Sequence, residues 1–234
     1  MITACIVTTL AYIIHRARVT RIIELERVRT RIATDLHDDI GSGLSQVAML
    51  TELLDRRVGS DSPVSEPLSA IGDVSRDLID SMNDIVWAIN PLRDHVSDLT
   101  HRMRRFASEV LGARDIELQF EGLDEPRDFA LGPDVRREVW LIFKEAVNNV
   151  ARHAACTRAD FSLAVRHDSL ALSIRDNGRG FDPQSAGDGN GLASMRQRAA
   201  RLGGTLEVIS ERGQGTAVNF RAPRRRRRRW TRSS

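Results

Sequence analysis

The sequence predicts an α+β chain in which a pair of long helices precedes a separate α/β domain. Two observations carry this prediction. Apolar residues recur every three or four positions over the first half, and strand-like alternation between glycine-rich turns replaces that spacing after about residue 112. The 234 residues suffice for one or two domains. With 41% hydrophobic and 29% charged residues, the chain is neither disordered throughout nor a polytopic membrane protein.

The N-terminal segment, residues 2–14, is an uncharged run of thirteen residues, whereas about 20 are needed to cross a bilayer. Arg16, Arg18 and Arg21 follow at once, as on the cytoplasmic flank of a membrane helix, and no small-residue cleavage site follows the run. We therefore predict that residues 1–15 are the inner end of a transmembrane helix whose beginning is missing from this chain. The alternative is an ordinary apolar helix start.

The next segment forms one continuous amphipathic helix in this prediction. Between residues 22 and 54 its apolar positions advance by about 3.6 residues a step, the repeat of an α-helix. A turn is predicted at residues 59–67, and a second apolar stripe covers residues 68–106. Pro91 lies inside this second stripe and is expected to kink the helix or to mark a joint in it.

Two antiparallel helices of this length cannot bury their apolar stripes on all sides against each other. The economical solution is a two-fold dimer whose two helical hairpins form a four-helix bundle. We assign residues 16–111 to this dimerising helical region.

The second half of the chain combines strands with helices. Five segments alternate apolar and polar residues as strands do: residues 116–120, 159–165, 170–174, 205–209 and 216–220. Two segments have helical spacing, residues 134–154, with Asp134 as the N-cap, and residues 192–202. We predict a domain over residues 112–223 in which helices cover one face of a mixed sheet.

The net charge of +3 is unevenly distributed along the chain. Residues 224–234 contain seven arginines, so the remainder carries a net charge of −4. This run is predicted to be a disordered, solvated tail, and no specific nucleic acid is expected as a partner; binding of nucleic acid or anionic lipid is the alternative. Cys5 and Cys156 lie far apart without a CxxC or Cys/His cluster, which argues against a disulfide scaffold or structural zinc and fits a reducing compartment.

His37 lies on the first long helix within the segment LHDDIG, at the solvent edge of the apolar stripe. An imidazole beside a carboxylate suits nucleophilic attack. Asp38 can accept the proton of one ring nitrogen and leave the lone pair of the other nitrogen free. The alternative is a solvated surface histidine among acidic residues.

The predicted helix over residues 134–154 contains the segment KEAVNNVARHA, in which Glu145, Asn149 and His153 share one face. A carboxylate, a carboxamide and a potentially cationic group in a row suit a hydrated metal–triphosphate, because magnesium prefers oxygen ligands. The alternative is a polar helix face in water.

Three glycine-rich segments lie near predicted strands. In DNGRGFD, Asp176 ends a strand and can accept a hydrogen bond from an exocyclic amine, while the glycines let backbone amides approach a ligand. The segment GDGNGL precedes a helix whose free amides attract phosphate oxygens. The segment GQGT is also compatible with a simple hairpin turn.

In this order, the segments resemble a sensor histidine kinase of the class that signals to response regulators with helix-turn-helix DNA-binding output domains. The likeness covers nearly everything from about residue 24 to residue 223. LHDDIG matches the phosphoacceptor box, KEAVNNVARHA the N box, and DNGRGFD, GNGL and GQGT three glycine boxes. DIVWAINP resembles the second bundle helix of this class. Five boxes in register make a chance match improbable.

The resemblance implies a phosphoacceptor bundle joined to an ATP-binding domain of the type shared with gyrases, Hsp-type chaperones and mismatch-repair ATPases. It implies that His37 is phosphorylated from Mg-ATP, with Asp38 stabilising the imidazolium. The further residues that it implies are Glu145 to orient water or metal, Asn149 as a Mg²⁺ ligand, Arg152 and His153 near the phosphates, Asp176 on the adenine amino group, Gly178, Gly180, Gly189 and Gly191 as the ends of a mobile lid, and Thr216 in the nucleotide site.

The resemblance also implies partners and a location. The partners are a second copy of the chain, the receiver domain of a response regulator, whose aspartate takes the phosphoryl group, and the membrane through the N-terminus. The location is the inner membrane, with the catalytic part in the cytoplasm. Because the ATP-binding domain must move toward the bundle, a hinge is expected at residues 111–115. Relatives that dephosphorylate their partner often have glutamine or histidine at the position of Ser42, so weak phosphatase activity is predicted.

Two rival functions fit parts of the sequence. An ATPase switch of the same nucleotide-binding superfamily would not need an LHDD segment on a bundle helix. A catalytically silent scaffold is less compatible, because no box lacks its key residue.

Overall fold

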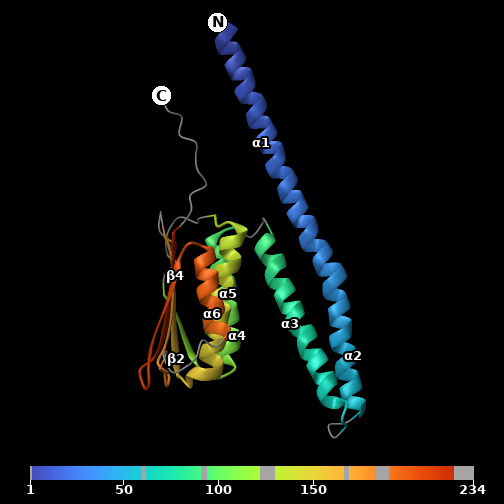
Figure 1. Cartoon of the computed structure of the whole chain (residues 1–234), viewed down its shortest axis with the longest axis vertical. Coiled ribbons are helices and arrows are strands. Elements are labelled where there is room, and N and C mark those ends of the chain that lie inside the picture. The colour runs from blue at the N-terminus through green and yellow to red at the C-terminus, as the bar shows by residue number, and fades with distance from the viewer. Residues whose placement is uncertain are drawn as a thin grey trace. The chain divides into compact units, whose positions relative to one another are not determined.

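The computed structural model describes residues 2–58, 62–90, 94–121, 130–165, 169–182 and 190–223. The chain forms two compact units, Met1–Arg93 and Asp94–Ser234. Figure 1 labels the elements of both units, and each unit is described by itself below. The predicted Arg-rich tail, residues 224–234, lies outside the described residues.

Apart from residues 62–64 and Asn90, the described residues of the first unit are helical. α1 (Ile2–Asp35) continues through a π-helical segment, η1 (Leu36–Gly41), into α2 (Ser42–Val58). α3 (Ser65–Ile89) then returns alongside α2 and packs on it (Figure 1). The continuous helix and the returning second helix were both predicted, whereas the π-helical segment was not.

The N-terminal apolar run, residues 2–14, forms the start of α1. Within the part of the chain that the structure describes, no helix combines the length and the apolar content needed to cross a membrane. The prediction that residues 1–15 end a transmembrane helix stays a prediction.

The α2–α3 hairpin buries only part of its apolar surface. Gly72 of α3 lies so close to α2 that a Cβ atom added to it would be 3.1 Å from the Thr51 hydroxyl oxygen. Other apolar side chains of both helices stay exposed, including Leu50 at 58% and Val74 at 58%. Each helix therefore keeps an apolar line that no described residue covers.

The second unit is built on a five-stranded mixed sheet. Its strands are β1 (Glu117–Glu121), β2 (Arg158–Val165), β3 (Ser169–Asp176), β4 (Thr205–Glu211) and β5 (Gly215–Pro223). The order in the sheet is β1-β2-β3-β5-β4, with β1 and β2 parallel and every other neighbouring pair antiparallel. Each predicted strand is present within two or three residues of its expected bounds.

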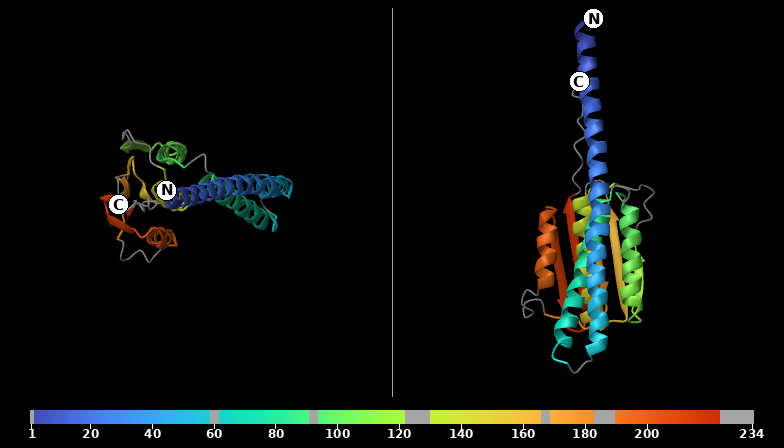
Figure 2. Two further views of the ribbon diagram at one scale, coloured as in Figure 1. Left: turned by 90° about the horizontal axis from the view of Figure 1, so that it is seen from above. Right: turned by 90° about the vertical axis from the view of Figure 1, so that its right-hand side faces the viewer.

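Helices cover one face of this sheet (Figure 2). They are α4 (Val96–Gly112), α5 (Pro133–Asn149), which runs on into the π-helical turn η3 (Val150–Ala154), and α6 (Asn190–Arg201). Phe143 of α5 and Phe161 of β2 are buried with their ring centroids 5.4 Å apart. The predicted α+β architecture, with long helices before a mixed sheet covered on one face, is confirmed.

The border between the units differs from the predicted one. The sequence analysis assigned residues 96–111 to the helical region, but α4 packs on α5 and β1 in the second unit. Leu99, Met103 and Leu111 of α4 are fully buried there. An apolar stripe shows that a helix packs on something without showing on what. The predicted joint at Pro91 lies outside the described residues, between the end of α3 and the start of α4.

The start of the second unit is fixed by a buried charge. The guanidinium of Arg136 on α5 is 0% exposed, and its Nη2 lies 2.7 Å from Oδ1 of Asp94. The Leu131 amide also donates to the carbonyl oxygen of Asp94 at 2.7 Å. Since a charge taken out of water needs a partner, this ion pair holds residue 94 against α5.

Residues 111–115, where a hinge was expected, lie inside the second unit. The Asp115 amide donates to the Gly112 carbonyl oxygen, and the Ile116 amide donates to that of Leu111. These hydrogen bonds join α4 to β1 in a tight turn, so the division between the units comes before α4.

Candidate functional site

A cavity of about 400 Å³ opens in the second unit where α5, the end of β3 and the start of α6 meet. Eight of the residues singled out in the sequence line it: Glu145, Asn149, Arg152, His153, Asp176, Gly180, Gly191 and Thr216. Apolar side chains complete the lining, among them Ile174 and Val218 on neighbouring strands. Residues from four sequence segments thus meet at one site.

Asp176 is the last residue of β3 and is only 5% exposed. Its Oδ1 accepts hydrogen bonds from the amides of Gly178 at 2.9 Å and Thr216 at 3.2 Å. Burial raises the pKa of the Asp176 carboxyl above its ordinary value, and the two hydrogen bonds offset this only in part. Because both amides bind Oδ1, Oδ2 is left to accept a hydrogen bond from a ligand.

Two glycines of DNGRGFD are packed against backbone where no side chain fits. A Cβ atom on Gly178 would lie 2.2 Å from the Ala154 carbonyl oxygen, and one on Gly180 only 1.9 Å from that of Glu211. Gly180 also has a φ of 56°, which favours glycine. The segment therefore runs in close contact between η3 and the β4–β5 hairpin. The predicted part of these glycines in a mobile lid stays a prediction, and Gly189 lies outside the described residues.

Glu145 of α5 lies against the first turn of α6. A Cβ atom on Gly191 would be 2.1 Å from Glu145 Oε1, so the end of the Glu145 side chain would have to shift if another residue stood there. A carboxylate at a helix N-terminus is favoured by the partial positive charge of that end. Glu145 is thereby held at the cavity beside Asn149.

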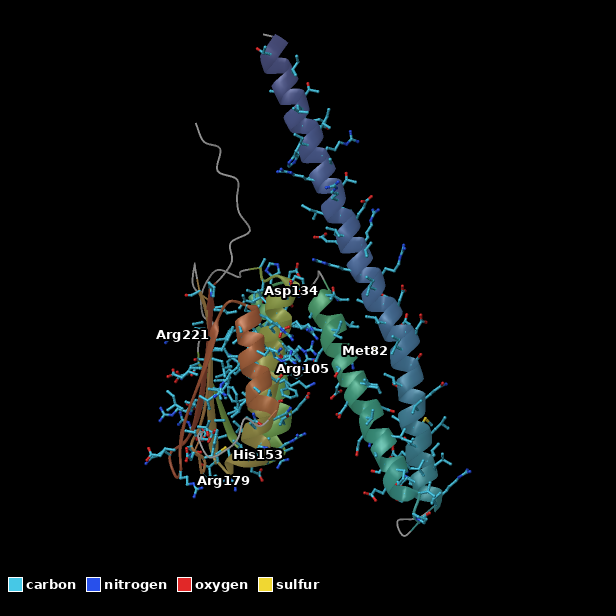
Figure 3. The ribbon with its side chains drawn as sticks, in the orientation of Figure 1. Met82, Arg105, Asp134, His153, Arg179 and Arg221 are labelled. Carbon is cyan, nitrogen blue, oxygen red and sulfur yellow. The ribbon has the colours of Figure 1, made fainter. Side chains whose placement is uncertain are left out.

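His37 and Asp38 belong to the first unit, where they lie in η1. π-Helical turns are rare and are frequent at functional sites. The structure describes the backbone of His37 but not its side chain, while Asp38 is exposed. The Ser42 hydroxyl donates a hydrogen bond to the Asp38 carbonyl oxygen. α3 passes close to Gly41 at the end of η1, since a Cβ atom there would lie 2.7 Å from Cε of Met82, which Figure 3 labels.

The sequence analysis missed two residues of the loop after β3. Arg179 lines the cavity, and its Nε donates to the His153 carbonyl oxygen at 2.7 Å. The Asn177 Oδ1 accepts from the amides of Thr157 and Arg158, at 3.0 Å each. Their only sequence signal was their place beside Asp176 in DNGRGFD.

Two family models match the chain, one in each unit. The model of the family described as Histidine kinase-, DNA gyrase B-, and HSP90-like ATPase matches residues 134–226, which include every residue of the cavity. The model of the family described as Histidine kinase matches residues 28–94, which include the LHDDIG segment.

Similar curated proteins are named as sensors or signalling kinases. Sensor histidine kinase LiaS of Bacillus subtilis (strain 168) is 26% identical over 197 residues, 83% of this chain and 54% of LiaS. Signal transduction histidine-protein kinase/phosphatase UhpB of Salmonella typhimurium (strain LT2) is 28% identical over 88% of this chain and 41% of UhpB. Sensor protein VraS of Staphylococcus aureus is 25% identical over 91% of this chain and 59% of VraS. The chain thus spans about half the length of these relatives.

A solved structure supports the fold. The histidine kinase domain from the Erythrobacter litoralis EL346 blue-light activated histidine kinase superposes with a TM-score of 0.50 at 18% identity. The superposition covers 78% of this chain and 94% of that one.

The matches define the class of the protein as a histidine kinase helix region together with a nucleotide-binding domain of the histidine kinase, gyrase and HSP90 type. Together these two regions match the sensor histidine kinases of two-component systems. The rival of an ATPase switch or scaffold without phosphohistidine chemistry is not favoured, because the histidine kinase match includes LHDDIG.

Proposed function

We propose that this chain phosphorylates itself on His37 from ATP and passes the phosphoryl group to an aspartate of a response regulator. One observation carries the proposal: a nearly buried carboxylate, Asp176, and the polar face of α5 line one cavity. The same chain carries LHDDIG in its other unit. ATP use follows from the family of the second unit, whereas the reaction on His37 and the partner are inferred.

The cavity suits ATP in its size and lining. About 400 Å³ lies within the range of small-molecule sites. Asp176 Oδ2 would accept a hydrogen bond from the adenine amino group, and Ile174 and Val218 would contact the apolar base. Arg152 and His153, which line the cavity from η3, would approach the negatively charged phosphates.

The residues at the cavity also fit Mg²⁺, which prefers oxygen donors. Asn149 would be its protein ligand, with Glu145 beside it to orient water or the metal. Among the residues that the structure describes, no group of three or more His, Cys, Asp and Glu side chains gathers as a metal site. This fits an ion bound chiefly through water and phosphate oxygens. When bound, Mg²⁺ would offset the negative charge of the triphosphate.

The reaction forms a bond between a ring nitrogen of His37 and the γ-phosphorus. It breaks the bond from that phosphorus to the bridging oxygen and releases ADP. Asp38 would stabilise the positive charge that develops on the imidazole. Most of the rate enhancement would come from holding the two reacting groups in line. The phosphorus–nitrogen bond then breaks as the phosphoryl group moves to the carboxylate of the partner.

A second copy of the chain is the proposed partner of the helical unit. Exposed apolar residues recur at helical spacing on α2, at Val47, Leu50 and Leu54, and on α3, at Ile71, Val74 and Leu78. Burying them between two hairpins gives the predicted four-helix bundle.

Membrane attachment through residues 1–15 and a cytoplasmic location of the catalytic part stay predictions. They depend on the uncharged run and the arginines after it. Fractionation of cells that express the chain tests them: the protein is expected in the membrane fraction, and recovery in the soluble fraction would contradict the attachment.

Incubation with γ-labelled ATP and Mg²⁺ tests the proposed reaction. The unaltered chain should acquire acid-labile, base-stable label. His37→Gln should lose the label while keeping its affinity for ATP, and Asn149→Asp should lose both. His15→Gln changes another exposed histidine of the same unit and should keep the label. Label that persists on His37→Gln would overturn the proposal.

A further inference from the structure

The loop after β3 is bonded to η3, the turn that follows α5, through a residue without an assigned role, Arg179. Arg179 Nε donates to the His153 carbonyl oxygen at 2.7 Å, and the Arg179 amide donates to that of Ala154 at 2.8 Å. Figure 3 shows Arg179 and His153 at the same end of the second unit, and both line the cavity.

These hydrogen bonds pair the carbonyl groups at the end of a helix. η3 ends at Ala154, and the φ of 48° at the next residue, Ala155, is incompatible with a right-handed helix. The last carbonyl groups of a helix lack intrahelical partners and carry partial negative charge. A guanidinium that donates to one of them is a favourable cap. The turn that carries Arg152 and His153 is therefore held from outside by Arg179.

The loop that provides this cap is itself fixed. The Gly213 amide, in the turn between β4 and β5, donates to the Arg179 carbonyl oxygen at 2.7 Å. The Phe181 amide donates to the hydroxyl of Ser210 on β4 at 2.9 Å. Arg179 therefore links η3 to the β4–β5 hairpin.

Asp176 does not depend on this link. Its Oδ1 is held by the Gly178 and Thr216 amides, and its backbone is paired within the sheet to Ala159 and Thr216. Loss of the Arg179 side chain would thus loosen η3, which would keep only the backbone hydrogen bond from the Arg179 amide to Ala154, while the Asp176 carboxylate stays in place.

We propose that Arg179 is a positioning residue of the nucleotide site, which acts by holding η3, and with it Arg152 and His153, against the loop that follows Asp176. It would thereby set the separation between the base-binding carboxylate and the phosphate-facing turn. This inference rests on the proposed function, because it assigns ATP to this cavity.

Two substitutions of matched length separate the hydrogen bond of Arg179 from its charge. In Arg179→Gln the side-chain amide nitrogen occupies the position of Nε along the chain, so it keeps a donor for His153 without the positive charge. Arg179→Met has the same length as the Gln variant but has no donor. Arg175→Met is the control, because Arg175 is an exposed residue of β3 that does not line the cavity.

The affinities of the full chain for ATP and for adenosine give the first readout. Arg179→Met should weaken ATP binding about tenfold, about 1.4 kcal/mol, and leave adenosine binding unchanged. Arg179→Gln and Arg175→Met should stay within about threefold of the unaltered chain for both ligands. Equal losses of affinity for ATP and for adenosine would indicate general damage to the cavity and would overturn the inference. The inference would also be overturned if Arg179→Gln weakened ATP binding as much as Arg179→Met, or if Arg179→Met left ATP binding unchanged.

Hydrogen exchange without nucleotide gives the second readout and does not depend on the proposed function. Arg179→Met should speed exchange of the amides of residues 150–155, whereas Arg179→Gln and Arg175→Met should not. Unchanged exchange in Arg179→Met would overturn the inference. If the unaltered chain fails to bind ATP, the proposed function fails, and hydrogen exchange still decides whether Arg179 holds η3.

Discussion

The two units of this chain differ in how far they bury their apolar residues. In the second unit Phe143, Phe161 and Phe220 are at most 1% exposed, whereas in the first unit Leu50 is 58% exposed and Leu78 is 49% exposed. A sheet covered by helices completes a core within one chain, but a two-helix hairpin has too little surface to do so. The second unit thus completes its own core, whereas the first leaves exposed the apolar side chains that we assign to the proposed dimer interface.

This difference has a functional consequence. The cavity lies in the second unit, which completes its own core, so its carboxylate and glycine loop are positioned without help from another chain. In the proposed dimer, His37 lies on a helix that packs against a second copy. We therefore expect nucleotide binding to be independent of dimerisation, and phosphorylation of His37 to depend on it.

The largest expected effect comes from removing a core side chain of the second unit. Phe161→Ala should lower the free energy of unfolding of that unit by about 3 to 5 kcal/mol, because it leaves a cavity between Phe120 and Phe143. Urea unfolding measures the change. Ile209→Ala, at a residue of the same sheet that is 56% exposed, should change it by less than about 0.5 kcal/mol. Similar losses of unfolding free energy in the two variants would contradict a core that is complete within the second unit.

The next largest effect is expected in the first unit, at the proposed dimer interface. Leu78→Asp should destabilise the proposed dimer by about 1.5 to 3 kcal/mol for each copy, because each copy loses the burial of one leucine. Sedimentation velocity at several concentrations should show a monomer. The matched control, Asn83→Asp, changes an exposed polar residue of the same helix and should leave the dimer intact. A Leu78→Asp dimer of unaltered affinity would show that this face is not the interface.

A smaller effect is expected at Ser42, whose hydroxyl is engaged by the helix backbone at Asp38. Ser42→Gln should raise dephosphorylation of the phosphorylated response regulator, with ADP present, about fivefold, or about 1 kcal/mol, because a longer amide can reach water. Ser45→Gln, one turn further along α2, should not raise it. A fast rate for the unaltered chain would contradict the weak phosphatase activity predicted for Ser42.

The smallest expected effect is a pH dependence of the second unit. Burial raises the pKa of Asp176 in the folded state, so its contribution to stability is present below the ordinary aspartate pKa of about 3.9 and is lost as the pH rises through the raised value. Asp176→Asn removes this titration. Urea unfolding should show the variant gaining stability relative to the unaltered chain between pH 4 and pH 7. The opposite trend would show that the hydrogen bonds to Oδ1 outweigh burial.

The sequence predicted the elements well because their signals are local. Helical spacing indicated the continuous α1–η1–α2 helix and α3, and apolar alternation indicated all five strands. The glycine segments and the face of Glu145, Asn149 and His153 on α5 were also visible, since residues four apart share a helix face. The unit to which α4 belongs was not visible in the sequence, because a periodic apolar stripe looks the same whichever element the helix packs on.

What the sequence determined by itself was the set of elements, the class of protein and eight of the sixteen residues that line the cavity. What only the tertiary structure decided was how distant segments meet. The buried pair of Arg136 with Asp94 and the cap of Arg179 on His153 join residues far apart in the chain. Local spacing carries no information about such contacts, because they depend on the path of the whole backbone.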